Sequence, residues 1–155
     1  MKKLLKTFLL LLISFYSFSQ NKNSAFKSVD QKIFNLPVYK SENLDSLSKS
    51  LTKDFSTEKE KVRAVYDWVA NNISYNTPKF IERSKHGNEL LKMRDDSEDA
   101  EKIIHSRSAV CEGYSNLVKV LCNKSGIACE IIEGIWRPEN GSDDLHAWNV
   151  VKIDG

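Results

Sequence analysis

Apolar residues recur at helical spacing in the first half of the chain. One stripe has intervals of three and four residues, which predicts a short amphipathic helix, and it consists of Leu44, Leu47, Leu51 and Phe55. A second helix is expected to begin after Thr57, because Thr57-Glu58-Lys59-Glu60 fits a capping box. Its apolar stripe consists of Val62, Val65, Tyr66, Val69, Ala70 and Ile73. Ile73-Ser74-Tyr75 predicts an extended segment, which ends at Asn76-Thr77-Pro78.

The hydrophobic pattern is weaker around these helices. Gln20 to Lys40 is polar with scattered apolar residues, and we interpret it as a linker that becomes an arm lying on the domain. Lys79 to Ser97 is charged, and both a surface excursion and a short helix fit it. Asp99 to His105 predicts one or two helical turns with apolar residues facing inward, and Arg107 to Val110 predicts a loop.

The last third of the chain predicts a helix followed by two strands. The helix begins at Cys111, and its buried stripe and C-terminal cap consist of Tyr114, Leu117, Val118, Leu121, Cys122 and Gly126. Ala128 to Trp136 predicts a strand, and its adjacent apolar pair Ile131-Ile132 predicts that both faces are covered. A polar loop leads to a second strand over His146 to Ile153, and Asp154-Gly155 is typical of a hairpin turn.

The N-terminal residues have the pattern of a secretory signal peptide over Met1 to Ser19. Its positive region consists of Lys2, Lys3 and Lys6. Leu9 to Ile13 is the centre of a short apolar run, and the small residues Ser17 and Ser19 predict cleavage before Gln20. An uncleaved membrane anchor is the alternative, but the apolar run is shorter than the ~20 residues of a spanning helix. We therefore expect an exported protein, periplasmic, cell-surface or secreted, with no stable membrane insertion after cleavage.

Composition and charge narrow the class of protein. The chain has 155 residues, of which 41% are hydrophobic and 28% charged, the balance of one soluble globular domain. Lys and Arg number 23 against 21 Asp and Glu, which gives a net charge of +2, and three of the positive charges lie in the expected leader. The remaining balance, 2 − 3 = −1, excludes the basic face of a nucleic-acid binder.

Two residues of complementary chemistry begin separate elements. Cys111 begins a predicted helix, where the first-turn amides and the helix dipole favour a thiolate. His146 begins a predicted strand 35 positions later, and a helix packed on a sheet can bring the two starts together. An imidazole beside a thiol forms an ion pair and supplies a proton to a leaving group. The alternative is a small buried cysteine and a surface histidine, and spacing alone does not decide between them.

The other cysteines pose a choice between a disulfide and free thiols. Cys111 and Cys122 are 11 positions apart on one helix, about 16.5 Å at ~1.5 Å per residue, which is beyond disulfide reach. Cys122 and Cys129 flank the predicted helix-to-strand turn and are candidates for a disulfide in an exported protein, which would leave Cys111 as the free thiol. Two buried thiols are the alternative.

Metal sites fit the sequence poorly. The candidate zinc ligands are Cys111, Cys122, Cys129 and His146. Their gaps of 10, 6 and 16 residues contain no Cys-x-x-Cys pair. The acidic run from Arg94 to Asp99 lacks the Asp-x-Asp-x-Asp-Gly spacing of a calcium loop. We therefore expect no metal.

Two short motifs surround the candidate thiol and imidazole. One is Val110-Cys111-Glu112-Gly113-Tyr114-Ser115-Asn116-Leu117, and the other is His146-Ala147-Trp148-Asn149-Val150. Supporting segments are Lys61 to Val69, Asn72 to Tyr75, Gly126-Ile127 and Gly134. The first two resemble the nucleophile motif and the histidine motif of the transglutaminase-like core of secreted bacterial proteins. The supporting segments resemble the first helix, the turn and the first strand of the same core. The resemblance runs from about Asp54 to the last residue.

The resemblance implies an α+β fold with a papain-like, transglutaminase-like core, in which the nucleophile helix packs on an antiparallel β-sheet. It also implies a Cys-His-Asp arrangement, with Cys111 as the nucleophile and His146 as base and imidazolium partner. The acid of the family lies on the strand after the histidine strand, so we expect it beyond Gly155 and the core to be C-terminally incomplete. Ala109 departs from the family, which often has glycine there.

The expected organisation is a signal peptide over 1–19, an arm and short helix over 20–53 and a transglutaminase-like domain over 54–155. The resemblance implies acyl transfer or hydrolysis at a protein or peptide amide through a Cys111 thioester, with the backbone N–H of Cys111 as an oxyanion donor. Such a reaction needs no metal and no organic cofactor, so we expect none. Tyr75 and Trp148 are candidates to line the cleft, and ordinary aromatic core is the alternative for both. A non-enzymatic protein- or cell-wall-binding module that keeps the fold is the alternative function. The oligomeric state does not follow from the sequence.

Overall fold

The structure, a computed structural model, describes residues 25–36, 43–85, 99–137, 139 and 143–154. Its helices are α2 (Lys27–Phe34), α3 (Leu44–Thr52), α4 (Glu58–Asn72), α5 (Thr77–Lys85), α6 (Ala100–Ser106) and α7 (Cys111–Lys124). Its strands are β1 (Ser74–Tyr75), β2 (Ser108–Ala109), β3 (Cys129–Trp136) and β4 (Asp144–Val151). The predicted signal peptide and most of the acidic run lie outside the described residues. No helix in the described ranges is long and apolar enough to cross a membrane.

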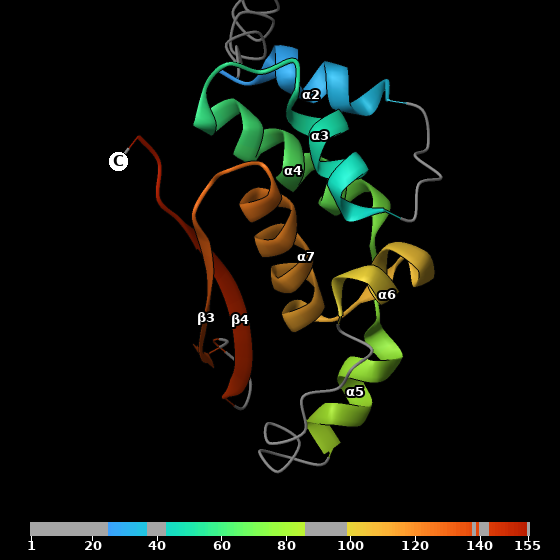
Figure 1. The fold of residues 1–155 in the computed structure, drawn as a ribbon. Coiled ribbons are helices and arrows are strands. Elements are labelled where there is room, and N and C mark those ends of the chain that lie inside the picture. Colours follow the sequence, from blue (N-terminus) through green and yellow to red (C-terminus); the bar gives the residue numbers. More distant parts are fainter. Residues whose placement is uncertain (1–24, 37–42, 86–98, 138, 140–142, 155) are drawn as a thin grey trace, which may run out of the picture.

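Helix α7 is the centre of the fold (Figure 1). The antiparallel hairpin of β3 and β4 packs along it, α3 and α4 also pack against it, and α2 lies on α4. The chain leaves β2 directly into the start of α7, and the hairpin end of β3 and β4 lies at this same end of the molecule (Figure 1). The expected arrangement of a nucleophile helix packed on an antiparallel sheet is therefore present.

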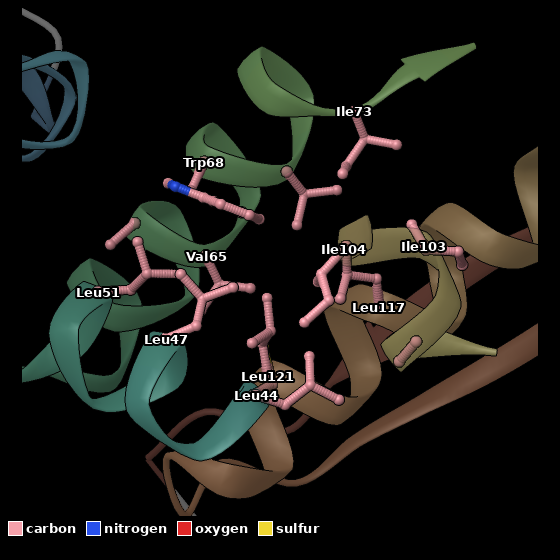
Figure 2. Packing of buried hydrophobic residues seen from close by; sticks show 14 of the residues in the cluster. Leu44, Leu47, Leu51, Val65, Trp68, Ile73, Ile103, Ile104, Leu117 and Leu121 are labelled. Atoms are coloured by element: carbon pink, nitrogen blue, oxygen red, sulfur yellow. The ribbon is translucent and has the colours of Figure 1, made fainter. Parts of the chain in front are cut away.

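The main core lies between the helices (Figure 2). Its large side chains are at most 2% exposed and include Leu47, Leu51, Val65, Trp68, Leu117 and Leu121. The hydroxyl of Ser48 on α3 donates to the carbonyl oxygen of Leu121 on α7 at 2.9 Å, so this buried polar group is satisfied. The predicted amphipathic helix at Leu44 and the predicted helix at Cys111 are both confirmed.

The capping box of α4 is confirmed. The backbone N–H of Glu60 donates to Thr57 Oγ1 at 3.2 Å, and the N–H of Thr57 donates to Glu60 Oε2 at 3.1 Å. The predicted stripe is wrong at Tyr66 and Ala70, which are exposed. The buried side of α4 instead centres on Trp68, because positions three and four residues apart share a helix face.

The predicted arm lies on the domain, and its part from Lys27 to Phe34 is a helix, α2, which the interpretation as a linker did not include. In α2, Val29 and Ile33 are one turn apart and both are buried, so the helix packs its apolar side on α4. A two-residue stripe is too short to stand out in the sequence. Of the two alternatives for the charged segment after Lys79, a helix is present up to the end of α5, and 86–98 lie outside the described residues.

A second correction concerns the predicted loop from Arg107 to Val110, which contains strand β2. β2 pairs in parallel with β1, so that Tyr75 lies opposite Ala109. The N–H of Ser74 donates to Arg107 O at 2.8 Å, and the N–H of Asn76 donates to Ala109 O at 2.9 Å. Because parallel pairing joins segments far apart in sequence, two residues of strand carry no local signal. This short ladder holds the end of α4 beside the start of α7.

The β3–β4 hairpin has one open face and one face that α7 covers in part, because Ile135, on the side of Cys129, is 60% exposed near the hairpin end. Asn149 of β4 donates to Ser115 O of α7 at 2.9 Å, and Ala147 is buried, so alternate residues of β4 face the helix. His146 and Trp148 lie on the other face. The prediction that both faces of β3 are covered is wrong, because Ile132 on that open face is 48% exposed.

Candidate active site

Cys111 is the first residue of α7 and is partly exposed. The residue before it, Val110, is extended and provides no side-chain cap, so no side chain of the N-cap occupies the first-turn N–H groups. Its carbonyl accepts from the N–H of Tyr114 at 3.0 Å and starts the helical ladder. The first turn of α7 thus presents a thiol together with backbone donors, as the sequence predicts.

Tyr75 lies beside this helix start because β1 pairs with β2. Its ring stacks on Tyr114 of α7 with centroids 6.1 Å apart, and it meets Phe80 of α5 at 6.0 Å. The hydroxyl of Tyr114 in turn donates to the carbonyl oxygen of Ile73. Tyr75 is still 44% exposed, so it lines the surface next to Cys111 and is not an ordinary core aromatic.

The pKa of Tyr75 responds to Cys111 and to Asp144 of β4. Burial raises the pKa of the Tyr75 phenol, and negative charge on Cys111 and on Asp144 raises it further. Hydrogen bonding to the backbone of Cys111 lowers the pKa of the same phenol. The raised pKa keeps the phenol protonated, so its O–H is available as a donor near the start of α7. Asp144 is the first residue of β4, so the start of this strand contributes to the electrostatics of Tyr75.

His146 is partly exposed and lies near the start of β4. Its imidazole packs against the indole of Trp148, with ring centroids 5.0 Å apart and an interplanar angle of 86°. Trp148 is 40% exposed and is therefore not a core residue either. Among the hydrogen bonds of the described residues there is none between the Cys111 thiol and the His146 imidazole. The structure joins Cys111 to Tyr75, and His146 to Trp148, at one end of the molecule.

Two residues that the sequence analysis did not single out support the site. Arg83 on α5 forms an ion pair with Glu112 in the first turn of α7, at 3.4 Å. Asn149, three residues after His146, donates to Ser115 O at 2.9 Å and to Cys129 Sγ at 3.5 Å, which ties β4 to α7. Asn149 lies within the quoted histidine motif, but no local pattern predicts the contacts of either residue, because each partner comes from a distant segment.

Cys122 and Cys129 are neighbours in the core and are free thiols in this structure. A hydrogen bond between the two thiols and burial raise the pKa of Cys122, whereas the same hydrogen bond lowers the pKa of Cys129. Their closeness agrees with the predicted pair, and the disulfide itself stays a prediction. In the described ranges, no three His, Cys, Asp or Glu side chains gather so as to hold a metal ion.

Comparison with solved structures supports the fold. The chain is similar to a candidate cysteine protease from Cytophaga hutchinsonii, with a TM-score of 0.56 and 22% identity over 79% of this chain and 41% of that one. It is also similar to a TGase, with a TM-score of 0.52 and 19% identity over 96% of this chain and 36% of the other. The predicted α+β fold of the transglutaminase-like and papain-like type is confirmed.

Sequence comparison identifies the family. The human kyphoscoliosis peptidase is 26% identical over 148 residues, which are 85% of this chain and 21% of that protein. The mouse kyphoscoliosis peptidase is 25% identical over 120 residues, or 72% of this chain and 16% of that protein. The chain thus spans about a fifth of the length of these curated relatives. Residues 45–155 match the family model of the transglutaminase-like superfamily. The protein therefore belongs to the transglutaminase-like superfamily.

Proposed function

We propose that this protein is a thiol enzyme that transfers or hydrolyses the acyl group of a protein or peptide amide, with Cys111 as its nucleophile. The observation that carries the proposal is the position of Cys111. It is partly exposed at a helix N-terminus without a side-chain cap, and Tyr75, on the strand paired with β2, lies next to this helix start. First-turn N–H groups stabilise negative charge at such a position, which suits both a thiolate and an oxyanion.

In the proposed reaction the Cys111 thiolate attacks the amide carbonyl carbon, and the carbonyl electron pair moves to the oxygen. The backbone N–H of Cys111 and the hydroxyl of Tyr75 donate to that oxyanion. When the tetrahedral intermediate collapses, the C–N bond breaks and imidazolium His146 gives its proton to the leaving amine. Water or a second amine then attacks the thioester, loses its proton to His146 and releases the thiolate.

The pairing of Cys111 with His146 is a step of this proposal. The two residues lie near the same end of the molecule, at the starts of α7 and β4. Charge on Cys111 of α7 and on Asp144 of β4 raises the pKa of Tyr75. His146 projects from the open face of β4 and not from the face that packs on α7. The pairing therefore requires a rearrangement of His146 or of the start of β4, and substrate binding is proposed to bring it about. The expectation of an orienting acid beyond Gly155 stays a prediction.

We also propose that the protein is exported. The support is the sequence alone, with positive residues before a short apolar run and small residues at the expected cleavage point. N-terminal sequencing of protein from the producing cells is expected to begin at Gln20. A mature chain that still begins at Met1 would contradict this.

A non-enzymatic binding module is the second candidate. The observation in its favour is that the described residues contain no hydrogen bond between the Cys111 thiol and the His146 imidazole. In that case the fold would present the open face of the β3–β4 hairpin and the aromatic residues near Cys111 to a protein partner, without turnover.

One experiment separates the two functions. The protein is incubated with a glutamine-containing peptide, with and without a primary amine, and the peptide is followed by mass spectrometry. An enzyme deamidates, cross-links or cleaves the peptide, and the product disappears in Cys111→Ala but persists in Cys122→Ala, the matched control. Binding of the peptide without any product in the wild-type protein would favour the binding module.

A further inference from the structure

Trp148 fills the space between two residues near the hairpin end of β3 and β4. Its indole meets the imidazole of His146 at a centroid distance of 5.0 Å and an angle of 86°. On the facing strand the indole covers Gly134. A Cβ atom at that position would lie 2.8 Å from Trp148 Cζ3 and 3.3 Å from Cη2, closer than side-chain carbons pack. Glycine is therefore the residue that leaves room for the indole in this orientation.

The strand register shows that the indole of Trp148 does not lie over its own cross-strand partner. Gly134 is the partner of His146 across the hairpin, whereas the partner of Trp148 is Ile132. The indole thus leans diagonally, away from its own partner and over the His146–Gly134 pair, a reach that large side chains have between antiparallel strands. Trp148 is 40% exposed, so core burial does not account for its orientation.

We propose that Trp148 is a positioning residue for His146 and that Gly134 permits this role. The inference rests on the proposed function of His146. Staggered rotamers offer an imidazole on an open sheet face several directions. The indole fills the space on the side of His146 nearest Trp148. Rotamers of His146 that would place the imidazole in this space are therefore excluded. The imidazole is then restricted to the directions that remain, and less ordering is needed when it meets the thiol.

The size of the effect follows from the contact. An edge-to-face aromatic pair favours one arrangement over others by about 2- to 12-fold. The backbone of Gly134 does not have a positive φ, so an alanine there is opposed by Trp148 and not by its own conformation. Gly134→Ala is therefore expected to displace the indole, and this effect is expected to vanish when the indole is absent.

The first test observes His146 directly and needs no activity. NMR of the histidine-labelled protein follows the ring proton on Cε1 of His146, which is assigned with His146→Gln. Trp148→Leu and Gly134→Ala are each expected to move this resonance, and Gly134→Ala is expected to add nothing in the Trp148→Leu background. Ile132→Ala, which removes an apolar side chain from the same face, is the control and is expected to leave the resonance in place.

Two NMR results would overturn the positioning role. One is an unmoved His146 resonance in Trp148→Leu, and the other is an equal effect of Gly134→Ala in both backgrounds. Trp148→Phe keeps a ring and supplies the test if Trp148→Leu does not fold. It is expected to move the resonance less than the leucine variant.

The second test connects the position to chemistry. The rate of Cys111 alkylation by iodoacetamide at pH 6, divided by its rate at pH 9, reports on the imidazole and is insensitive to simple loss of packing. We expect about a 2- to 12-fold lower ratio in Trp148→Leu and partial recovery in Trp148→Phe. If the NMR shifts occur but the ratio is the same in wild type and His146→Gln, the proposed thiol–imidazole chemistry fails and the positioning role stands. If the ratio depends on His146 but not on Trp148, the positioning role fails.

Discussion

Asp67 is a buried carboxylate on α4, and only one of its two oxygens is paired with a cation. It is 7% exposed, and its Oδ1 lies 3.1 Å from Nη2 of Arg63, whereas its Oδ2 is buried without a hydrogen-bond partner. The same guanidinium binds Asp30 of α2 through two contacts of 2.9 and 3.3 Å. One cation is thus shared by two carboxylates, and Asp30 holds the better geometry. We predict that the stability of Asp67→Asn relative to wild type increases as the pH rises.

The magnitude follows from the pKa of Asp67. Burial raises it from 3.8 to about 6, the hydrogen bond with Asp30 acts in the same direction, and Arg63 opposes both. The folded state therefore binds a proton more tightly than the unfolded state, and stability falls as the pH rises from about 4 through 6. At ~1.36 kcal/mol per pH unit, the fall amounts to about 3 kcal/mol overall, of which about 2 kcal/mol lies between pH 4.5 and 8.

Asp30 acts in another pH range. Arg63 and then Asp67 lower the pKa of Asp30 below 3.8 through hydrogen bonds, so its contribution to stability is complete above about pH 4 and is lost only in stronger acid. The window from pH 4.5 to 8 therefore isolates Asp67 from its neighbour.

Urea unfolding followed by tryptophan fluorescence gives the free energy of unfolding at pH 4.5, 6 and 8. The difference between Asp67→Asn and wild type is expected to shift by about 2 kcal/mol in favour of the variant across this range. Asp45→Asn is the matched control, because Asp45 pairs with Lys124 at 2.7 Å on the surface with its side chain 73% exposed. Its effect is expected to be small and similar at all three pH values. A pH-independent difference for Asp67→Asn would refute the reasoning.

Four further predictions test the site and the core. Cys111 is expected to react with iodoacetamide at pH 6 much faster than the buried thiols Cys122 and Cys129, and equal rates measured by peptide mapping would contradict an activated thiol. Tyr75→Phe is expected to lower kcat by about 10²-fold with little change in KM, because only the developing oxyanion loses a donor; an unchanged kcat would remove the phenol from the proposed mechanism. Mild oxidation is expected to join Cys122 to Cys129, since the two buried thiols are close enough to shift each other's pKa; two free thiols after oxidation, found by mass spectrometry, would show that the pair cannot reach disulfide geometry. Leu121→Ala is expected to lower the free energy of unfolding by about 2–5 kcal/mol, because Leu121 is fully buried between α3 and α7; a loss below about 1 kcal/mol in urea unfolding would mean that the core collapses around the cavity.

Local sequence patterns were sufficient for the longer helices. The stripe beginning at Leu44, the capping box at Thr57 and the helix start at Cys111 depend on residues three or four positions apart, and all three are confirmed. The family motifs around Cys111 and His146 also predicted the superfamily to which the chain belongs. In each case the interactions that stabilise the element, or the residues that form the motif, are neighbours along the chain.

Local sequence patterns failed where an element packs or pairs with residues that are distant in the sequence. The buried residues Val29 and Ile33 acquire their role only against α4, and the parallel pairing of Tyr75 with Ala109 joins segments more than thirty positions apart. Ile132 has the composition of a covered strand, yet it faces outward, because strand alternation allows only one face of β3 to meet α7. Burial is a property of the assembled layers, and hydrophobicity alone does not determine it.

For this protein, the sequence by itself determined the main helices, the strand pair and the two residues most suited to thiol chemistry. Only the tertiary structure decided which groups surround them. It brought the phenol of Tyr75 to Cys111 through a two-residue parallel ladder, and it placed Trp148 over Gly134 beside His146. Secondary structure depends on contacts within a few residues, whereas a site depends on side chains from distant segments. Its geometry is therefore set by packing and register, which no local pattern contains.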